Sequence, residues 1–567
     1  MRCQARAPFR LESRWVGGLP LVNGLLRRLR IDTYLTQALP ARDARARTAP
    51  AQILGVLLRN IILNQRRPLY SQGEWAARAD PALLGWPPDA RPVVTDDQIG
   101  RALDQLFHAD RASVLTAVVV GAVRTFHLEL DQLHNDSTTV TFSGDYARAT
   151  GAPVAGHPTL RITHGHNKDH RPDLKQLLFV LTVSADGTVP VHYRALDGQT
   201  SDAVTHVDTW NTLRQIVGRD DFLYVADSKL CSRESLAYLA AHHGRFITVL
   251  PRTRREDGWF RRYVQDHTPP WHEAVRRPNP RRPGGAEDVW KVVEAAVLSA
   301  EGYRVIWVWN SLMAWHDADS RQAHIEKAWL AIEQLQTKLQ GPRCRYRTRG
   351  RIEAAAHALL TATGAGRWVA VTIDEHVEPV FRQERKGRPG ARTRYVRTGR
   401  PRFTVRATTH TDLVEQDART DGMFPLLTNT DLTPAEILNA YKAQPRLEKR
   451  FEQLKSVEAV TPVWLKKATR IEALLFLYFI SLLVQALLER ELRQAMVAAS
   501  VDQLPLYPEE RECRAPSAER VLEVFASLQR HDLWAGTRRV QTFQPQLDAL
   551  QERIVALLGM PAADFIT

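Results

Sequence analysis

The sequence predicts an α/β fold in which a mixed β-sheet is interrupted by a large inserted domain and flanked by N- and C-terminal helical regions. Three observations lead to this prediction. Helical periodicity covers the beginning of the chain, strands and helices then alternate as far as residue 250, and regular helix returns only near residue 433. The interval between residues 250 and 433 is far longer than an ordinary loop, so it must contain structure of its own.

The N-terminal region has a helical pattern from about residue 10 to residue 126. Its clearest helix covers residues 51–63 (AQILGVLLRNIIL), with a long apolar face and a start signal in Thr48 and Pro50. The region contains arginines that could contact DNA, among them Arg27, Arg28, Arg30, Arg66 and Arg67. A compact DNA-binding domain would have this pattern, and so would any small helical bundle.

The sheet begins with three predicted strands. Residues 137–142 (STTVTF) are rich in β-branched side chains, and residues 176–183 and 189–193 also have strand character. The Asp186-Gly187 pair between the last two strands is a strong signal for a hairpin turn. These residues therefore predict a strand followed by a β-hairpin.

Helices and strands alternate after the hairpin. We predict helices over residues 203–217 and 234–242, and short apolar strands over residues 222–226 (FLYVA) and 246–250 (FITVL). The first three strands would form a meander, and the later strands would arrive through helical crossovers. This order fits the ribonuclease-H-like fold.

The inserted region is strongly basic. It contains a Pro/Arg/Gly loop at 276–285, a predicted helix at 321–339 and a strand at 368–373. Between residues 382 and 406, ten arginines and lysines accompany one acidic residue. Such a stretch is either a solvated hairpin or a contact to the DNA backbone, and the basic chain favours DNA. The residues expected to contact DNA are Arg385, Lys386, Arg388, Arg392 and Arg394.

A final helix is predicted from Thr433 to Lys455, with Thr433 and Glu436 as its capping pair. Tyr441, Glu448 and Lys455 follow one another at seven-residue steps, and each step drifts only about 20° around a continuous helix. These three side chains would then share one face. A hydroxyl, a carboxylate and an ammonium on one face suit a site that binds both metal and phosphate.

Composition narrows the class of partner. The 77 basic and 63 acidic residues leave a net charge of +14, which favours nucleic acid, although a ribosome-associated or anionic-membrane protein could share it. The four cysteines lack CxxC spacing, which argues against disulfides and structural zinc and indicates a reducing compartment. We expect a cytoplasmic protein, because no signal peptide is evident. Residues 473–488 are shorter than a membrane span of about 20 residues and predict a buried helix.

Three acidic residues are candidates for metal-dependent chemistry. Cutting a phosphodiester without a covalent intermediate needs two divalent ions about 3.5 to 4 Å apart, and Mg²⁺ prefers oxygen ligands. Asp136 lies at the first strand, Asp227 follows the buried strand FLYVA, and Glu448 lies on the final helix. The strands that carry the two aspartates are neighbours in a ribonuclease-H-like sheet, so we expect the aspartates to meet.

Two other groupings have different chemistry. His164, His166 and His170 with Asp169 have the donor types of a zinc site, but their polar segment is more typical of a loop near DNA. Tyr441 has the hydroxyl of a tyrosine-recombinase nucleophile but lacks the surrounding Arg and His residues. Neither grouping accounts for the three acidic residues.

Three segments carry a resemblance to a known family. Residues 134–142 (HNDSTTVTF), 222–230 (FLYVADSKL) and 441–455 (YKAQPRLEKRFEQLK) resemble the three acidic motifs of DDE transposases from bacterial insertion sequences. They are most similar to the group with a Tyr-Arg-Glu-Lys helix motif and a β-rich insertion in a ribonuclease-H-like catalytic domain. Residues 16–35, 165–176 and 461–493 also look like that group, so the resemblance covers nearly the whole chain.

The resemblance assigns roles to individual residues. It implies that Asp136, Asp227 and Glu448 bind two divalent ions, Mg²⁺ or Mn²⁺, and that Tyr441 and Lys455 contact DNA phosphates. One position departs from the family, because Gln444 stands where the helix motif of the family has an arginine. The following proline kinks the helix or begins a new one.

The resulting hypothesis is a transposase that cleaves at the ends of its element and transfers the strands into target DNA. Its partners would be double-stranded DNA, as terminal inverted repeats and as target, and a second copy of the chain, with no membrane. Two alternatives remain: a ribonuclease-H-fold nuclease without strand transfer, and a non-catalytic, domesticated DNA-binding protein.

The expected domain organisation follows from the motifs and composition. We predict a helical, DNA-binding N-terminal region at 1–125, the first part of the catalytic domain at 126–250, and an inserted basic domain at 251–423. The final helices of the catalytic domain cover 424–495, and a C-terminal helical region covers 496–567.

Overall fold

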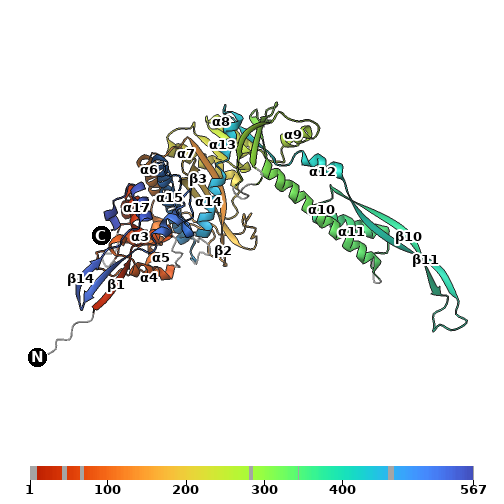
Figure 1. Cartoon of the computed structure of the whole chain (residues 1–567), viewed down its shortest axis with the longest axis horizontal. Helices are drawn as coiled ribbons and strands as arrows, with labels where there is room; N and C mark the ends of the chain where they lie inside the picture. The colour runs from red at the N-terminus through yellow and green to blue at the C-terminus, as the bar shows by residue number, and fades with distance from the viewer. Residues whose placement is uncertain are drawn as a thin grey trace. The chain divides into compact units, whose positions relative to one another are not determined.

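The structure is a computed structural model of the chain (Figure 1). The residues it describes are 9–40, 48–63, 69–279, 285, 287–341, 344–457 and 465–565. Some residues from the sequence-based predictions lie outside these ranges: Arg66, Arg67, residues 280–284 of the Pro/Arg/Gly loop, and residues 461–464.

The chain divides into two compact units, one formed by Met1–Thr248 with Asn439–Thr567 and the other by Val249–Leu438. In the first unit the strand order is β4-β3-β2-β5-β6. The bounds are β2 (Gln132–Phe142), β3 (Lys175–Ser184), β4 (Pro190–Leu196), β5 (Leu223–Ala226) and β6 (Arg245–Val249). Neighbours among β2, β3 and β4 are antiparallel, whereas β5 pairs with β2, and β6 with β5, in parallel. This order confirms the predicted ribonuclease-H-like fold class.

The sheet forms where the sequence has short apolar runs. All four residues of β5 and nine of the ten in β3 are buried, as expected for strands covered on both faces. The predicted turn between β3 and β4 is present, and Gly187 adopts φ +74° there. A side chain at Gly187 would be strained by that φ and would also meet the side chain of Arg490.

Two crossovers connect the later strands. The first contains a 3₁₀ turn, η3 (Asp202–Thr205), and α7 (His206–Val217), and the second contains α8 (Arg233–Ala241). Gly218 ends α7 in the left-handed region, with φ +79°. The side chain of Ser232 caps the first turn of α8. These elements agree with the helices expected from the sequence, with bounds shifted by a few residues.

The first unit contains the predicted helical flanks, built around one long helix, α15 (Ala468–Ala498). The other α-helices of these flanks are α1 (Leu19–Arg28), α2 (Ile31–Ala38), α3 (Pro50–Ile62), α4 (Gln72–Arg78), α5 (Asp96–His108), α6 (Arg111–Phe126), α16 (Ala518–Val524) and α17 (Ala549–Leu557). Figure 1 shows α15 among α3, α5 and α17, with which it packs. By length and composition α15 could cross a membrane, but its most apolar window is completely buried inside the structure. It therefore has the environment of a core helix.

The first unit also contains a three-stranded sheet that the sequence did not predict. β1 (Phe9–Trp15) pairs antiparallel with β13 (Gln529–Ala535), which pairs with β14 (Arg538–Phe543). The purely helical prediction for 496–567 is therefore wrong for this hairpin. Its signal was the turn after Ala535, where Gly536 adopts φ +62°.

The second unit has a sheet with the order β12-β9-β8-β7, in which neighbouring strands are antiparallel. Its bounds are β7 (His272–Arg277), β8 (Asp288–Glu294), β9 (Arg304–Asn310) and β12 (Met423–Thr428). The α-helices are α9 (Arg255–Asp266), α10 (Ser311–Gln340), α11 (Arg349–Thr363) and α12 (Thr411–Ala418). The predicted helix at 321–339 is thus part of α10.

A two-stranded ribbon, β10 (Val369–Gln383) and β11 (Tyr395–Thr409), belongs to the same unit. Near its base, Ile373, Phe403 and Val405 are buried against apolar residues of α10 and α11. The ribbon continues past both helices (Figure 1), and most of its outer residues are exposed. The predicted strand at 368–373 is the beginning of β10.

The predicted helix from Thr433 to Lys455 is not continuous. Helix α13 (Pro434–Tyr441) ends, α14 (Pro445–Glu452) begins at the proline, and a π-helical turn covers Gln453–Val457. Proline lacks the N–H that a helix interior requires but fits a first turn. The expectation that Tyr441, Glu448 and Lys455 share one unbroken face is therefore wrong.

Candidate active site

The two aspartates are brought together by parallel strand pairing. The register of β2 with β5 matches His134 with Val225 and Asn135 with Ala226, so Asp136 and Asp227 occupy the next positions along the two strands. The Asp136 carboxylate accepts a hydrogen bond of 2.7 Å from the Ser137 N–H. The Asp227 carboxylate accepts one of 3.0 Å from the Lys229 N–H. Asp227 directly follows β5 and Asp136 lies inside the longer β2, so both aspartates lie at the carboxyl end of β5, which is called the acidic edge below.

Like charge and burial make this edge favourable for a cation. Burial raises the pKa of Asp136 to about 6, and the carboxylates of Asp227 and Asp202 act in the same direction against the ammonium of Lys168. Burial also raises the pKa of Asp227. Ionising both aspartates at neutral pH is therefore costly unless positive charge is close.

Glu448 has a different environment. It lies exposed on α14, whereas the two aspartates are partly buried. The pKa of Tyr441 is raised to about 12, chiefly by burial and in addition by the negative charges of Asp227, Asp136 and Glu448. The Tyr441 hydroxyl is therefore close enough to all three acids to be affected by their charge. Among the described residues, however, no three acidic, His or Cys side chains form a group that could hold one ion.

The chemistry of the two aspartates fits a divalent metal ion. Their carboxylates supply hard oxygen donors, and Mg²⁺ needs only one or two protein carboxylates when waters and substrate phosphate complete its shell. Burial raises both pKa values, so a nearby cation would stabilise the ionised carboxylates. Asp136 and Asp227 are the residues that would hold such an ion.

Lys455 has a partner that the sequence did not predict. Its ammonium lies 2.6 Å from a carboxylate oxygen of Asp169, in the segment between β2 and β3. Asp169 is also the acid that the sequence groups with His164, His166 and His170 as donor types of a zinc site. In the part of the chain that the structure describes, these residues form no group able to hold a metal.

Gln444 fixes the break between α13 and α14 to the strand that carries Asp136. Its amide N–H donates to the Asn135 carbonyl oxygen at 3.1 Å, and its Oε1 lies 2.9 Å from His134 Nδ1. Burial lowers the pKa of His134 to about 4, so the ring is neutral at pH 7. Gln132 Nε2 lies 2.8 Å from the other ring nitrogen, which makes Nδ1–H the donor to Gln444. Glutamine thus has a structural role where the family motif has arginine.

Two charged residues of the site were not predicted from the sequence. Lys168 Nζ lies 3.6 Å from Asp136 Oδ1 and 3.0 Å from Asp202 Oδ2. Lys168 belongs to the segment 165–176, which resembles the family but has no role assigned by that resemblance. Asp202 begins η3, and its sequence context gave no signal.

The basic residues predicted to bind DNA lie in the second unit. The loop between β10 and β11 contains all five, and all are exposed: Arg385, Lys386, Arg388, Arg392 and Arg394. Arginine and lysine side chains displayed on a protruding ribbon suit contact with a polyanionic backbone. Their exposure is also that of a solvated hairpin.

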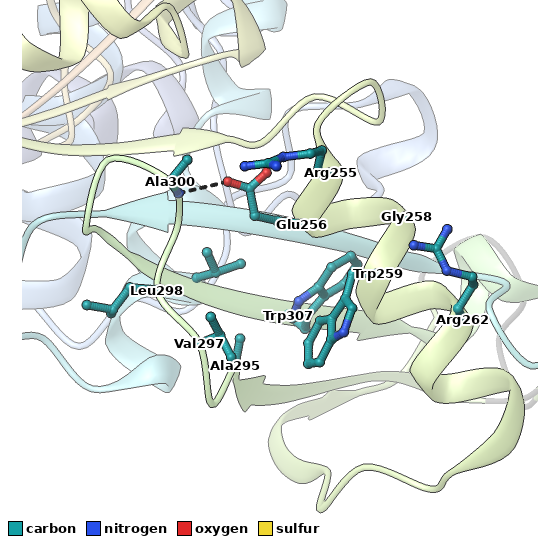
Figure 2. A pocket seen from close by; sticks show the side chains of 11 residues that line it. Arg255, Glu256, Gly258, Trp259, Arg262, Ala295, Val297, Leu298, Ala300 and Trp307 are labelled. Carbon is teal, nitrogen blue, oxygen red and sulfur yellow. Dashed lines mark hydrogen bonds between the residues drawn. The ribbon is translucent and has the colours of Figure 1, made fainter.

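The second unit also contains a hollow of about 640 Å³, lined by α9 and by the chain after β8. Figure 2 shows Trp259 beside Trp307, and the Ala300 N–H donates to the Glu256 carboxylate at 2.9 Å. Trp259 is half exposed and Trp307 is buried. None of the acidic or basic residues predicted from the motifs lines this hollow.

Residues 11–120 match a family model described as a domain of unknown function, DUF4277. No curated protein matches the chain. A cryo-EM structure of the piggyBac transposase synaptic complex with hairpin DNA is similar with a TM-score of 0.36 and 10% identity, covering 84% of this chain and 77% of that one. The fold assignment therefore stands on the strand order.

The raised pKa of Asp136 predicts a pH-dependent stability. Its folded value is about 6 against 3.8 for the free group, so the stability it contributes is present below pH 4 and is lost as pH rises through 6. In metal-free protein, Asp136→Asn should raise the free energy of unfolding by up to about 3 kcal/mol at pH 7.5, with a smaller gain at pH 4.5. Urea denaturation across this range measures the difference. The exposed Asp145→Asn is the control, and an equal gain at both pH values would contradict the prediction.

The buried role of Gln444 predicts a loss of stability on truncation. Gln444→Ala removes the partners of the His134 ring N–H and the Asn135 carbonyl, which should cost about 1–3 kcal/mol in the free energy of unfolding. Chemical denaturation measures this cost. Arg446→Ala, an exposed change two positions away, is the matched control. A Gln444→Ala protein as stable as the control would show that the contact is unimportant.

Proposed function

We propose that the protein is a DDE transposase from a bacterial insertion sequence, which cleaves DNA at the ends of its element and joins them to target DNA. The observation that carries this proposal is the register of β2 with β5, which sets Asp136 beside Asp227 at one edge of a ribonuclease-H-like sheet. The three acidic motifs and the exposed basic ribbon also support it.

Asp136 and Asp227 would hold divalent ions, Mg²⁺ or Mn²⁺, with Glu448 supplying the third carboxylate. When bound, such ions activate the attacking oxygen and stabilise the leaving oxygen of an in-line displacement. In cleavage, water attacks phosphorus and the 3′ oxygen leaves as a hydroxyl. In strand transfer, that 3′-hydroxyl attacks a target phosphodiester and displaces the 3′ oxygen of the target.

Tyr441 and Lys455 would position the DNA phosphates. A tyrosine hydroxyl is protonated at neutral pH, and burial raises the pKa of Tyr441 further, so the hydroxyl can donate a hydrogen bond to a phosphate oxygen. Lys455 would exchange its ion pair with Asp169 for a phosphate, which carries at least the same negative charge. Neither residue needs to change its protonation state.

The partners and location follow from this activity. The substrates would be the terminal inverted repeats of the element and double-stranded target DNA, both encountered in the bacterial cytoplasm at the nucleoid. Two element ends must be joined in one event, which favours a homodimer in the active complex. No step requires a membrane.

A second candidate is a DNA-binding protein that does not cut. The observation that favours it is the exposed position of Glu448, together with the lack of a three-ligand metal group among the described residues. A nuclease that cleaves without joining would share the metal-binding aspartates. Incubation with pre-cleaved ends and target DNA separates the transposase from both alternatives, because only a transposase produces joined strands. Divalent-metal-dependent nicking of a linear substrate then separates the nuclease from the protein that does not cut.

Replacing the third carboxylate tests the catalytic assignment. Glu448→Gln should lower Mg²⁺-dependent cleavage of the element ends on the order of 100-fold or more, because removing a metal ligand has a larger effect than removing a residue that only supports a ligand. End binding in a gel-shift assay should not change. Glu452→Gln, on the same helix, is the control and should cleave normally. Full cleavage by Glu448→Gln would remove Glu448 from the mechanism.

The ribbon predicts salt-dependent DNA binding. Changing the five basic loop residues to glutamine should weaken binding and flatten the plot of log K against log salt, by about 0.9 for each DNA phosphate that the loop no longer neutralises. Fluorescence anisotropy over a range of salt concentrations measures the slope. Arg553→Gln, an exposed change on α17, should leave it unchanged. An unaltered slope in the fivefold variant would mean that the loop is only a solvated hairpin.

A further inference from the structure

Lys168 occupies the centre of the acidic edge. Its ammonium donates hydrogen bonds of 2.7 Å to the carbonyl and to the hydroxyl oxygen of Ser137. It also lies 3.0 Å from Asp202 Oδ2 and 3.6 Å from Asp136 Oδ1. Ser137 and Asp202 use the three N–H donors of the ammonium, and the contact to Asp136 is a longer ion pair.

Three separate elements bring carboxylates to this lysine. Asp136 comes from β2, Asp227 follows β5, and Asp202 begins η3 after β4. The charge of Lys168 acts on all three, and the carboxylates repel one another. Three ionised carboxylates and one ammonium leave two negative charges at the edge, which favours the binding of a further cation.

The backbone around Lys168 is held in place from several sides. Its N–H donates to the hydroxyl of Thr139 on β2 at 3.2 Å. The side chain of Asn167 accepts from the N–H groups of Asp169 and Arg171, at 2.8 and 3.2 Å, and closes the turn that follows. Asp169 in turn pairs with Lys455. The fold therefore directs the lysine side chain toward the aspartates.

We propose that Lys168, paired with Asp202, is a positioning residue that serves as the resident counter-ion of Asp136 and competes with the divalent ion for that carboxylate. The inference rests on the proposed metal site and deepens it. In metal-free protein the ammonium stabilises the acidic edge, and a divalent ion must displace it from Asp136. Asp202 gives the displaced ammonium a carboxylate partner.

Lys168→Met removes the charge and retains much of the apolar length of the side chain. Metal-free Lys168→Met should be less stable than the wild type in thermal unfolding, and Mn²⁺ should restore its stability. Calorimetric titration should show Mn²⁺ binding about tenfold tighter than in the wild type, because the competing charge is gone. Lys168→Arg keeps the charge and should behave like the wild type.

Lys175→Met is the matched control, since Lys175 pairs with the exposed Asp145 and should affect neither stability nor Mn²⁺ affinity. If Lys168→Met does not fold without metal, recovery of the fold by Mn²⁺ supports the proposal and failure to recover overturns it. Lys168→Gln provides a second neutral variant with the same expected result.

The outcomes separate this inference from the proposed function. Equal or weaker Mn²⁺ binding by Lys168→Met, with normal binding by the wild type, overturns the role of Lys168 and leaves the metal site intact. Failure of the wild type to bind Mn²⁺, or binding that is unchanged in Asp136→Asn, overturns the metal site and the role of Lys168 with it.

Discussion

The parallel pairing of β2 with β5 is the constraint on which the candidate site depends. It sets Asp136 next to Asp227 at a partly buried edge, so that two like charges share a poorly solvated space. No local motif produces this juxtaposition, because the residues that connect the two strands include a hairpin and a helical crossover. A nearby cation lowers the electrostatic cost of these paired charges. Lys168 lowers this cost, and a divalent ion bound in the proposed site would do the same.

Buried ion pairs hold the helices around that edge. Arg450 on α14 pairs with Glu489 on α15 at 2.9 Å, with both side chains almost fully buried, and Arg450 also donates to the Thr188 carbonyl oxygen at 3.1 Å. Arg490 pairs with Asp186 of the β3–β4 turn at 2.6 Å. Removing one partner of such a pair leaves an uncompensated buried charge, at about 3–5 kcal/mol. The inner face of α14 is therefore fixed to the sheet and to α15, while Glu448 stays exposed.

The sequence predicted the parts of this arrangement that local signals specify. The β-branched run before Phe142, the Asp-Gly turn and the short apolar strand before Asp227 each correspond to observed elements. The C-terminal hairpin was not predicted because its strand β13 is stabilised by β1, which comes from the other end of the chain. No short stretch of sequence contains both strands. The positions of Lys168 and Asp202 at the site were not predicted for a related reason. A polar loop residue does not indicate which strand edge its side chain reaches, and Gln444 was recognised only as a missing arginine rather than as the partner of His134.

The distribution of charge separates the proposed DNA-binding surface from the residues proposed for catalysis. The chain has a net charge of +14 and displays basic side chains on the exposed ribbon loop, yet the residues proposed for catalysis form a locally acidic edge. A DNA phosphate is attracted by the basic surface but repelled by three carboxylates that share one ammonium. At about 0.1 M salt, interactions between exposed charges are screened beyond about 10 Å, whereas partly buried charges are screened much less. The repulsion at the edge therefore persists when salt weakens the attraction at the basic surface. Monovalent salt should therefore control binding, whereas neutralisation of the acidic edge by divalent ions should control cleavage.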